Sequence, residues 1–470
     1  MTLSAWLREI AQTPPRPLTR REWWIVAAAT LLGAVSRFVT IARAPWDWDE
    51  FLFLLAIDHF DVAKHHPHPP GFPLFIAGGK LLRSVGFDNF HALQTMSVVA
   101  AMAIVPAMFF LCRELRMRFT TSIAAALLLA FFPNVWFFGG TAFSDVPSMT
   151  LIIITIALLL AGCRDPRAYV AGAVLLGIAA GFRPQNLLIG AVPFLMTAIV
   201  RCRGPLRALC VSAVKGFVPL ILIIAISYGA AASLTGWKPY AETMHNHSRF
   251  ILSTDSFLAP HRPSMWKVFL AFFVKPYRAP AINALVTLFA VISIAISIIR
   301  RRWHVVFAVA SFAPFCFFAW LMLDRLSTGR FSIGYAPLMA LLVADGIRLA
   351  MRSDAAEGIA AAVVIAVMIA WAWPAFANLR GSVSPPAAAA EWIRRHVDPK
   401  TSAIYVDDGM DATAQWYLPE YRRDPAAAYQ LREGRISGAV TFAHPRDRLW
   451  KIVRRRYFEV SVVVPARPIS

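Results

Sequence analysis

Long apolar runs recur along this sequence and restrict its fold more than any other feature. Predominantly apolar stretches of about 18 to 24 residues follow one another from residue 23 to residue 373, and each can cross roughly 30 Å of hydrocarbon as a helix. We count about eleven such runs. The chain is 58% hydrophobic and only 16% charged, which excludes an ordinary water-soluble protein. The pattern predicts an all-α polytopic membrane protein.

Basic residues gather at the ends of the apolar runs rather than on one soluble face. They cluster at 16–21, 113–118, 164–167, 201–207, 300–302 and 348–352, in every second loop. The positive-inside rule places these loops, and with them the N-terminus, in the cytoplasm, with the chain in the inner (plasma) membrane. The formal net charge of +20 therefore reflects topology and membrane lipids as neighbours, and nucleic acid is not an expected partner.

The apolar runs end near residue 376, where the composition becomes that of a soluble domain. We expect residues 1–376 to form the transmembrane part, with long outer loops at 42–91 and 233–275. Residues 377–470 are expected to form a small, soluble α/β domain on the extracytoplasmic (periplasmic) side, with a helix at 391–397 and short strands at 402–406 and 458–464. Within the first outer loop, residues 51–60 and 72–85 are amphipathic and are predicted to lie flat in the interface.

Three acidic residues stand at the outer ends of apolar runs. Asp49 and Glu50 follow the first run directly, and Asp145 begins the fourth, so parity places all three on the same side. A carboxylate such as Asp49 can take a proton from an acceptor hydroxyl or amine, while Asp145 orients that group. Interfacial anchoring beside two tryptophans is the alternative, and Asp47 competes with Asp49 for the part of base.

Three further side chains on the outer side suit a phosphate. Arg183 and Arg330 each offer a guanidinium fork, which pairs bidentately with a lipid phosphate, and a proline-rich turn presents His68 in the same region. Snorkelling to the interface is the alternative for either arginine. The histidines at 65, 66 and 68 are interrupted by prolines and lack helical metal-ligand spacing, so we assign no metal ligand, and a divalent metal stays open as a cofactor.

The order of these motifs resembles that of the GT-C glycosyltransferases. The nearest likeness is to glycosyltransferase family 39, which holds protein O-mannosyltransferases and the aminoarabinose transferase for lipid A. The matching motifs span about 300 residues and are Asp49-Glu50, His68-Pro69-Pro70, Ser144-Asp145-Val146-Pro147 and Arg330-Phe331. The aminoarabinose branch has Lys where this chain has His68, and the late motif usually reads Arg-Tyr, so the resemblance does not identify the sugar.

This resemblance implies an inverting transfer of a hexosyl or pentosyl group from a polyprenyl-phosphate sugar to a lipid, glycan or protein acceptor. Asp49 would stand in the position of the catalytic base, Asp145 would assist it, and the His68 region and Arg330 would lie near the donor phosphate. Such a donor carries its own leaving group, so the protein need only bind the phosphate, orient the acceptor and take one proton. A Gly-rich nucleotide fingerprint is accordingly neither expected nor found in the sequence.

Two other functions fit a chain of this kind. A multi-span transporter or lipid flippase also has many spans and charged residues. Its charged residues are expected deep within the spans, however, and its two halves are expected to be repeats of each other. Here the acidic residues stand at helix ends, and no repeat is evident. A non-catalytic scaffold is the other alternative. If the chain has that function, the replacement of Asp49 by Asn should leave the measured activity intact.

Overall fold

The chain is a multi-pass membrane protein with a small α/β domain at its C-terminal end, as predicted. The computed structural model describes residues 2–201, 206–277, 279–323, 327–448, 452 and 457–465, with the backbone alone at 206–209. Within these residues 7 helices are long and apolar enough to cross a membrane, or up to 8 if the bent pair Asn89–Met102 and Ile104–Glu114 is one span. The predicted count of about eleven is therefore not confirmed. The basic cluster at 201–207 lies partly outside the described residues.

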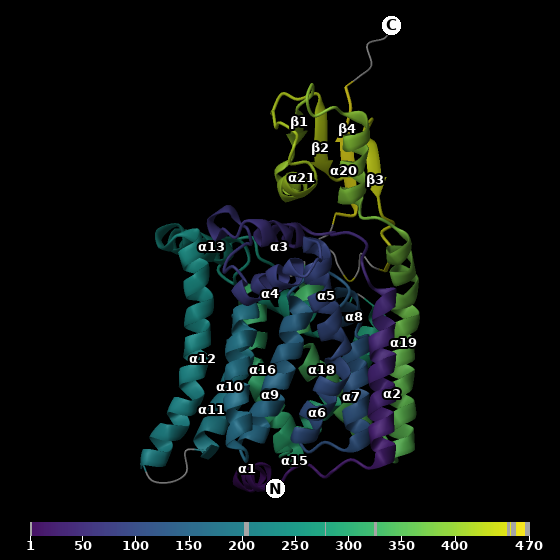
Figure 1. Cartoon of the computed structure of the whole chain (residues 1–470). Helices are drawn as coiled ribbons and strands as arrows, with labels where there is room; N and C mark the ends of the chain where they lie inside the picture. Colours follow the sequence, from purple (N-terminus) through teal and green to yellow (C-terminus); the bar gives the residue numbers. More distant parts are fainter. Residues whose placement is uncertain are drawn as a thin grey trace.

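The helices run side by side, with the N-terminus at one end of the bundle and the C-terminal domain at the other (Figure 1). The long helices and their shorter neighbours in the bundle are α2 (Arg20–Ser36), α5 (Asn89–Met102), α6 (Ile104–Glu114), α7 (Phe119–Phe131), α9 (Asp145–Gly162), α10 (Pro166–Phe182), α11 (Asn186–Arg201), α12 (Leu206–Thr235), α15 (Pro280–Arg300), α16 (Trp303–Met322), α18 (Ala336–Ala350) and α19 (Asp354–Gly381). Three of the predicted spans, α7, α10 and α11, form apolar helices shorter than a full membrane crossing.

Local sequence signals explain where these helices begin and break. Thr19 and Glu22 form a reciprocal capping box at the start of α2, which satisfies backbone N–H groups that the first turn leaves unpaired. Pro133 separates α7 from α8 (Pro133–Phe138), because proline cannot continue the hydrogen-bond ladder. The predicted break at Arg183-Pro184 is confirmed, since α10 ends at Phe182 and α11 begins at Asn186.

Short helices close the two ends of the bundle. At the N-terminal end, α1 packs by Trp6 against Phe307, a helix that the sequence reasoning did not predict. The short helices are α1 (Leu3–Gln12), η1 (Arg37–Val39), α3 (Trp48–Asp58), η2 (Val62–Lys64), α4 (Pro73–Ser84), α13 (Trp237–Thr254), α14 (Met265–Phe269), η3 (Leu270–Val274), α17 (Thr328–Phe331) and η5 (Ser332–Tyr335). The two long outer loops predicted at 42–91 and 233–275 therefore contain helices rather than irregular chain.

Helix α3 differs from its predicted place in the membrane interface. It crosses the end of the bundle beneath the C-terminal domain (Figure 1), and its Phe51, Phe53 and Leu54 are fully buried. The Phe51 ring lies 5.6 Å from the ring of Tyr417 in the C-terminal domain. The apolar side chains of α3 are thus covered by the helix bundle on one side and by the C-terminal domain on the other. Hydrophobic periodicity in the sequence cannot reveal a tertiary contact of this kind.

The C-terminal domain is a four-stranded mixed sheet with two helices. Its elements are α20 (Pro385–His396), β1 (Ile404–Val406), η6 (Asp408–Met410), α21 (Asp411–Tyr417), β2 (Tyr429–Glu433), β3 (Val440–Ala443) and β4 (Glu459–Val463). The strand order is β1-β2-β4-β3, in which β1 pairs parallel with β2 and the other two pairs are antiparallel. The predicted helix and both predicted strands match α20, β1 and β4, whereas α21, β2 and β3 were not predicted.

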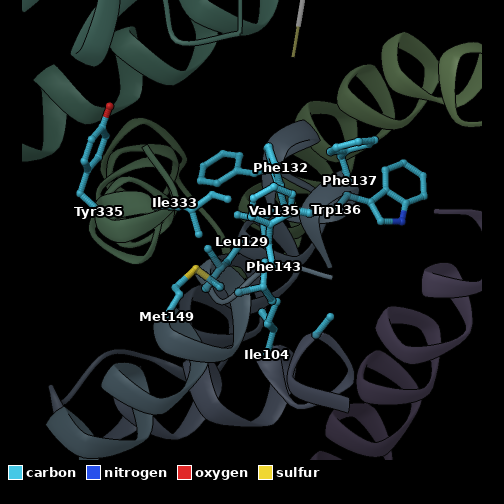
Figure 2. Packing of buried hydrophobic residues seen from close by; sticks show 14 of the residues in the cluster. Ile104, Leu129, Phe132, Val135, Trp136, Phe137, Phe143, Met149, Ile333 and Tyr335 are labelled. Carbon is cyan, nitrogen blue, oxygen red and sulfur yellow. The ribbon is translucent and has the colours of Figure 1, made fainter. Parts of the chain in front are cut away.

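A dense aromatic core supports the end of the bundle that faces the C-terminal domain. Phe132, Trp136, Phe137 and Phe143 are almost completely buried, and Figure 2 shows part of their packing. The loop between α8 and α9 runs over this core with no room for a side chain at Gly140. A Cβ there would lie 2.0 Å from the Thr40 carbonyl oxygen. This close backbone approach fixes the chain just before the start of α9.

Candidate active site

Two carboxylates and two guanidinium groups form one connected network at this end of the bundle. Arg330 in α17 donates from Nη1 to Asp49 Oδ2 and from Nε to Asp145 Oδ2, the latter at 3.0 Å. Arg183, which caps the C-terminal end of α10, pairs through Nη1 with Asp145 Oδ1 at 2.7 Å. Asp49 lies in the first turn of α3 and Asp145 begins α9. Four of the six predicted site residues are therefore in direct contact.

His68 lies beside this network without joining it by a hydrogen bond. Its Nδ1 is 3.7 Å from Asp49 Oδ1, and its ring packs at 5.3 Å from the Phe53 ring and 4.8 Å from the Phe72 ring. Burial lowers the pKa of His68 to about 4 against the pull of the nearby Asp49 carboxylate. The imidazole is therefore neutral near pH 7, so it can both donate and accept a hydrogen bond.

Asp49 and Asp47 stand in different environments, although they are two residues apart. Asp47 is the N-cap of α3, where its Oδ1 accepts the Asp49 backbone N–H at 2.8 Å. The Asp49 side chain is 26% exposed and faces His68 and Arg330. Burial favours protonation of Asp49, but His68, Arg330 and Arg183 outweigh it and hold its pKa below the usual range. Asp49 is thus ionised, and of the two residues it is the one whose carboxylate faces the network.

Glu50 is buried beside the network and is engaged by the backbone. Its Oε2 accepts the Trp46 N–H at 2.7 Å and its Oε1 accepts the Ala142 N–H at 3.0 Å. The carboxylate thereby joins the start of α3 to the loop that precedes Asp145. These contacts describe a group that positions both carboxylates of the network, and a direct part for Glu50 in chemistry stays a prediction.

Replacing Glu50 is expected to change how stability depends on pH. Burial raises the pKa of Glu50 to about 7 despite the two N–H donors. A raised folded-state pKa stabilises the protein fully below the unfolded pKa, and this contribution is lost as pH rises through 7. The wild-type Tm should therefore fall relative to that of Glu50→Gln between about pH 5 and pH 8 in detergent solution. Parallel Tm curves for the two proteins would contradict the buried carboxyl assignment.

Several residues of the site carry no signal in the sequence. Asn134 Nδ2 donates to the Gly329 carbonyl oxygen and to Ser332 Oγ, both at 2.9 Å, and so holds the turn that carries Arg330. Phe143 lies under the Arg330 guanidinium at 4.4 Å, a cation–π contact. These are ordinary neutral residues, and only the topology that pairs α8 with α17 brings them to the site.

A small cavity lies beside Asp145 and Arg183. Its volume is about 40 Å³, enough for little more than a water molecule. Its lining residues are Asp145, Ser148, Met149, Arg183, Gln185, Asn186, Ile189, Phe315, Leu323, Phe331 and Gly334. The network therefore borders a small pocket that has both polar and apolar lining residues.

The described residues contain no group of three or more His, Cys, Asp or Glu side chains placed to hold a metal ion. His68 lies near Asp49, but His65 and His66 are not grouped with them. Dependence on a divalent metal stays an open prediction, and the arginines are the cations that the site itself supplies.

Solved structures with a similar fold are glycosyltransferases of the membrane. ArnT from Cupriavidus metallidurans bound to undecaprenyl phosphate matches with a TM-score of 0.53 and 13% identity over 94% of this chain and 98% of that one. Its apo state gives 0.52. The apo oligosaccharyltransferase of Archaeoglobus fulgidus gives 0.51 and 11% identity over 87% of this chain, which spans 65% of that protein.

At these identities the likeness concerns the fold, and the chain has the fold of the GT-C glycosyltransferases. The GT-C resemblance drawn from the motifs is thereby confirmed. No family model and no curated protein matches the sequence. The finer resemblance to glycosyltransferase family 39 accordingly stays a prediction.

Proposed function

We propose that this protein is a membrane glycosyltransferase that moves a sugar from a polyprenyl-phosphate donor to an extracytoplasmic acceptor, with inversion at the anomeric carbon. The observation that carries the proposal is the network of Asp49, Asp145, Arg183 and Arg330 at one end of a GT-C fold. It combines a carboxylate for the acceptor proton with two guanidinium groups for a phosphate. Whether the acceptor is a lipid, glycan or protein is left to experiment.

In this mechanism the arginines bind the donor. A phosphate carries charge on several oxygens, and a guanidinium fork can contact two of them at once. Arg183 and Arg330 are both about nine-tenths buried, so their attraction for a phosphate is weakened little by water. The same charges stabilise the phosphate as it leaves the sugar, which is where negative charge develops.

Asp49 then acts on the acceptor. In the free protein Arg330 holds its carboxylate ionised and weakly basic. A donor phosphate that draws the Arg330 guanidinium away would raise the basicity of Asp49 at the moment when the acceptor is in place. The acceptor hydroxyl or amine attacks the anomeric carbon, its proton passes to Asp49, and the sugar–phosphate bond breaks to release polyprenyl phosphate. Asp145 holds the guanidinium groups of Arg183 and Arg330 in position beside each other.

The structural neighbours agree with this donor. ArnT, whose fold this chain shares over nearly its whole length, was solved with undecaprenyl phosphate bound.

A donor assay tests the proposal. Purified protein is incubated with polyprenyl-phosphate sugars of several kinds, and consumption of the donor is followed together with transfer to membrane acceptors. We expect Arg183→Gln to raise the KM for the donor about 10- to 100-fold, because a charge-assisted hydrogen bond is worth roughly 1.5 to 3 kcal/mol. Arg164→Gln is the matched control, since Arg164 is similarly buried and pairs with Glu114 far from the site.

The outcomes separate the candidate functions. Donor consumption by wild type, with Arg183→Gln impaired and Arg164→Gln normal, supports the transferase. Movement of intact lipid-linked sugar across a vesicle membrane, without cleavage of the sugar–phosphate bond, would instead identify a flippase.

A further inference from the structure

Two adjoining hollows lie at the end of the bundle opposite to the candidate active site. One is a groove of about 840 Å³ with charged walls, beside the segment that joins α1 to α2. The other is an apolar groove of about 460 Å³ between α2, α7 and α19. Phe119 and Thr120 at the start of α7 line both. The two hollows therefore form one continuous surface, which is charged at the bundle end and apolar toward the bundle middle.

The charged groove has an excess of positive groups. It is lined by four arginines, at positions 16, 113, 116 and 118, and three carboxylates, at positions 9, 22 and 354. Arg16 is neutralised by an ion pair with Glu22, and Arg118 by one with Asp354 at 3.2 Å. Glu114, which is next to the groove, is held by Arg164 through two hydrogen bonds. Arg116 has a longer pair with Glu9, at 3.9 Å, so the four arginines exceed the three carboxylates by one, and among the described residues Arg113 has no ion pair.

Carbonyl oxygens hold Arg113 and Arg116 in place. Arg113 donates to the Met117 carbonyl oxygen at 2.9 Å, and Arg116 donates from Nη2 to the Thr13 carbonyl oxygen. Among the described residues Nε and Nη1 of Arg116 have no hydrogen-bond partner, although Nε lies 3.9 Å from Glu9 Oε1. Guanidinium groups held in place in this way suit a phosphate.

The apolar groove follows α7 from Phe119 to Phe131. Its floor is α7, and its walls are α2 and α19, whose small Ala362 and Ala366 leave room between larger side chains. The lining is entirely free of charge. Helix α7 has 13 residues, so the groove runs for about 20 Å along the bundle. One leaflet of a bilayer contributes about 15 Å of hydrocarbon, half of the roughly 30 Å core.

We propose that this surface is a binding site for a membrane phospholipid with an anionic headgroup. The headgroup phosphate contacts Arg113 and Arg116, and one acyl chain lies in the groove over α7. The groove matches the depth of one leaflet, which favours an acyl chain over the much longer hydrocarbon of a polyprenyl phosphate. A bound lipid would join α1, α2, α7 and α19. The proposal does not depend on the proposed sugar transfer.

The first test measures lipid retention and thermal stability of the full-length protein in detergent. Added phosphatidylglycerol should raise the Tm and remain bound in native mass spectrometry, whereas phosphatidylcholine should do neither. Arg113→Gln combined with Arg116→Gln should lower the affinity for phosphatidylglycerol at least about 10-fold. Arg300→Gln combined with Arg301→Gln is the control, because both side chains are exposed and outside the groove.

A second variant tests the groove without touching the charges. Ala362→Phe and Ala366→Phe fill the groove from exposed positions on α19 and should reduce phosphatidylglycerol retention, while Val363→Phe, exposed outside the groove, should not. Equal retention by the groove variants and wild type would overturn the proposal. So would equal stabilisation by phosphatidylcholine, or displacement of phosphatidylglycerol by equimolar undecaprenyl phosphate.

Discussion

Asp49→Asn is expected to lower the rate of sugar transfer by about 100- to 10,000-fold, the range that a positioned general base contributes. The amide has nearly the same shape as the carboxylate and can still accept from Arg330, but it cannot take up a proton from the acceptor. Because the donor phosphate is bound by the arginines, the KM for the donor should change little while kcat falls. Both kcat and KM can be measured from initial rates, with purified protein and a polyprenyl-phosphate sugar that the wild type consumes in the donor assay.

Asp47→Asn is the matched control for this experiment. Asp47 is the N-cap of α3, and asparagine is as good a cap as aspartate, so helix and activity should both be retained. A loss of kcat in Asp47→Asn with normal turnover in Asp49→Asn would transfer the part of base to Asp47. Normal turnover in both variants would leave the non-catalytic scaffold as the better explanation.

The sidedness of the charged residues explains why much of the candidate site was predictable. Asp49, Asp145, Arg183 and Arg330 each stand where an apolar segment begins or ends, and charges inside a membrane protein must find partners. Alternating topology then places them at one end of the bundle, and the structure shows all four in contact. Hydropathy and parity were enough to group these residues, whereas the choice of Asp49 over Asp47 rested on the resemblance of the Asp49-Glu50 pair to the family motif.

The parts that could not be predicted depend on contacts between distant segments. Glu50 has the same sequence context as Asp49, yet it faces backbone N–H groups because the loop before Asp145 passes above it. Nothing in the run Phe51 to Ile57 shows that a C-terminal domain covers it. The strands β2 and β3 were missed because they have only five and four residues, too few for their alternation of apolar and polar residues to identify a strand, and they gain their places by pairing with β4.

Arg330→Met is expected to have the largest effect on stability. It removes the cation that joins Asp49 to Asp145 and leaves two carboxylates close together, of which Asp145 is 6% exposed. Breaking a buried pair from one side typically costs about 3 to 5 kcal/mol, and the partial exposure of Asp49 and the remaining Arg183 pair place this variant toward the lower end. The Tm in detergent should fall and transfer should be lost.

Two companion variants show whether charge pairing is the cause. Arg330→Lys keeps the charge but not the fork that reaches both carboxylates, so it should recover stability in part and activity hardly at all. Adding Asp49→Asn to Arg330→Met removes the carboxylate that has lost its arginine partner, while Asp145 keeps Arg183, and should restore part of the lost Tm, a coupling of about 0.5 to 3 kcal/mol. If the two effects are simply additive, Arg330 stabilises the fold through its packing on Phe143 rather than through the carboxylates. In that case the packing of the surrounding fold, and not the ion pairs, would position the residues of the network. Only the activity of the variants would then give information about phosphate binding.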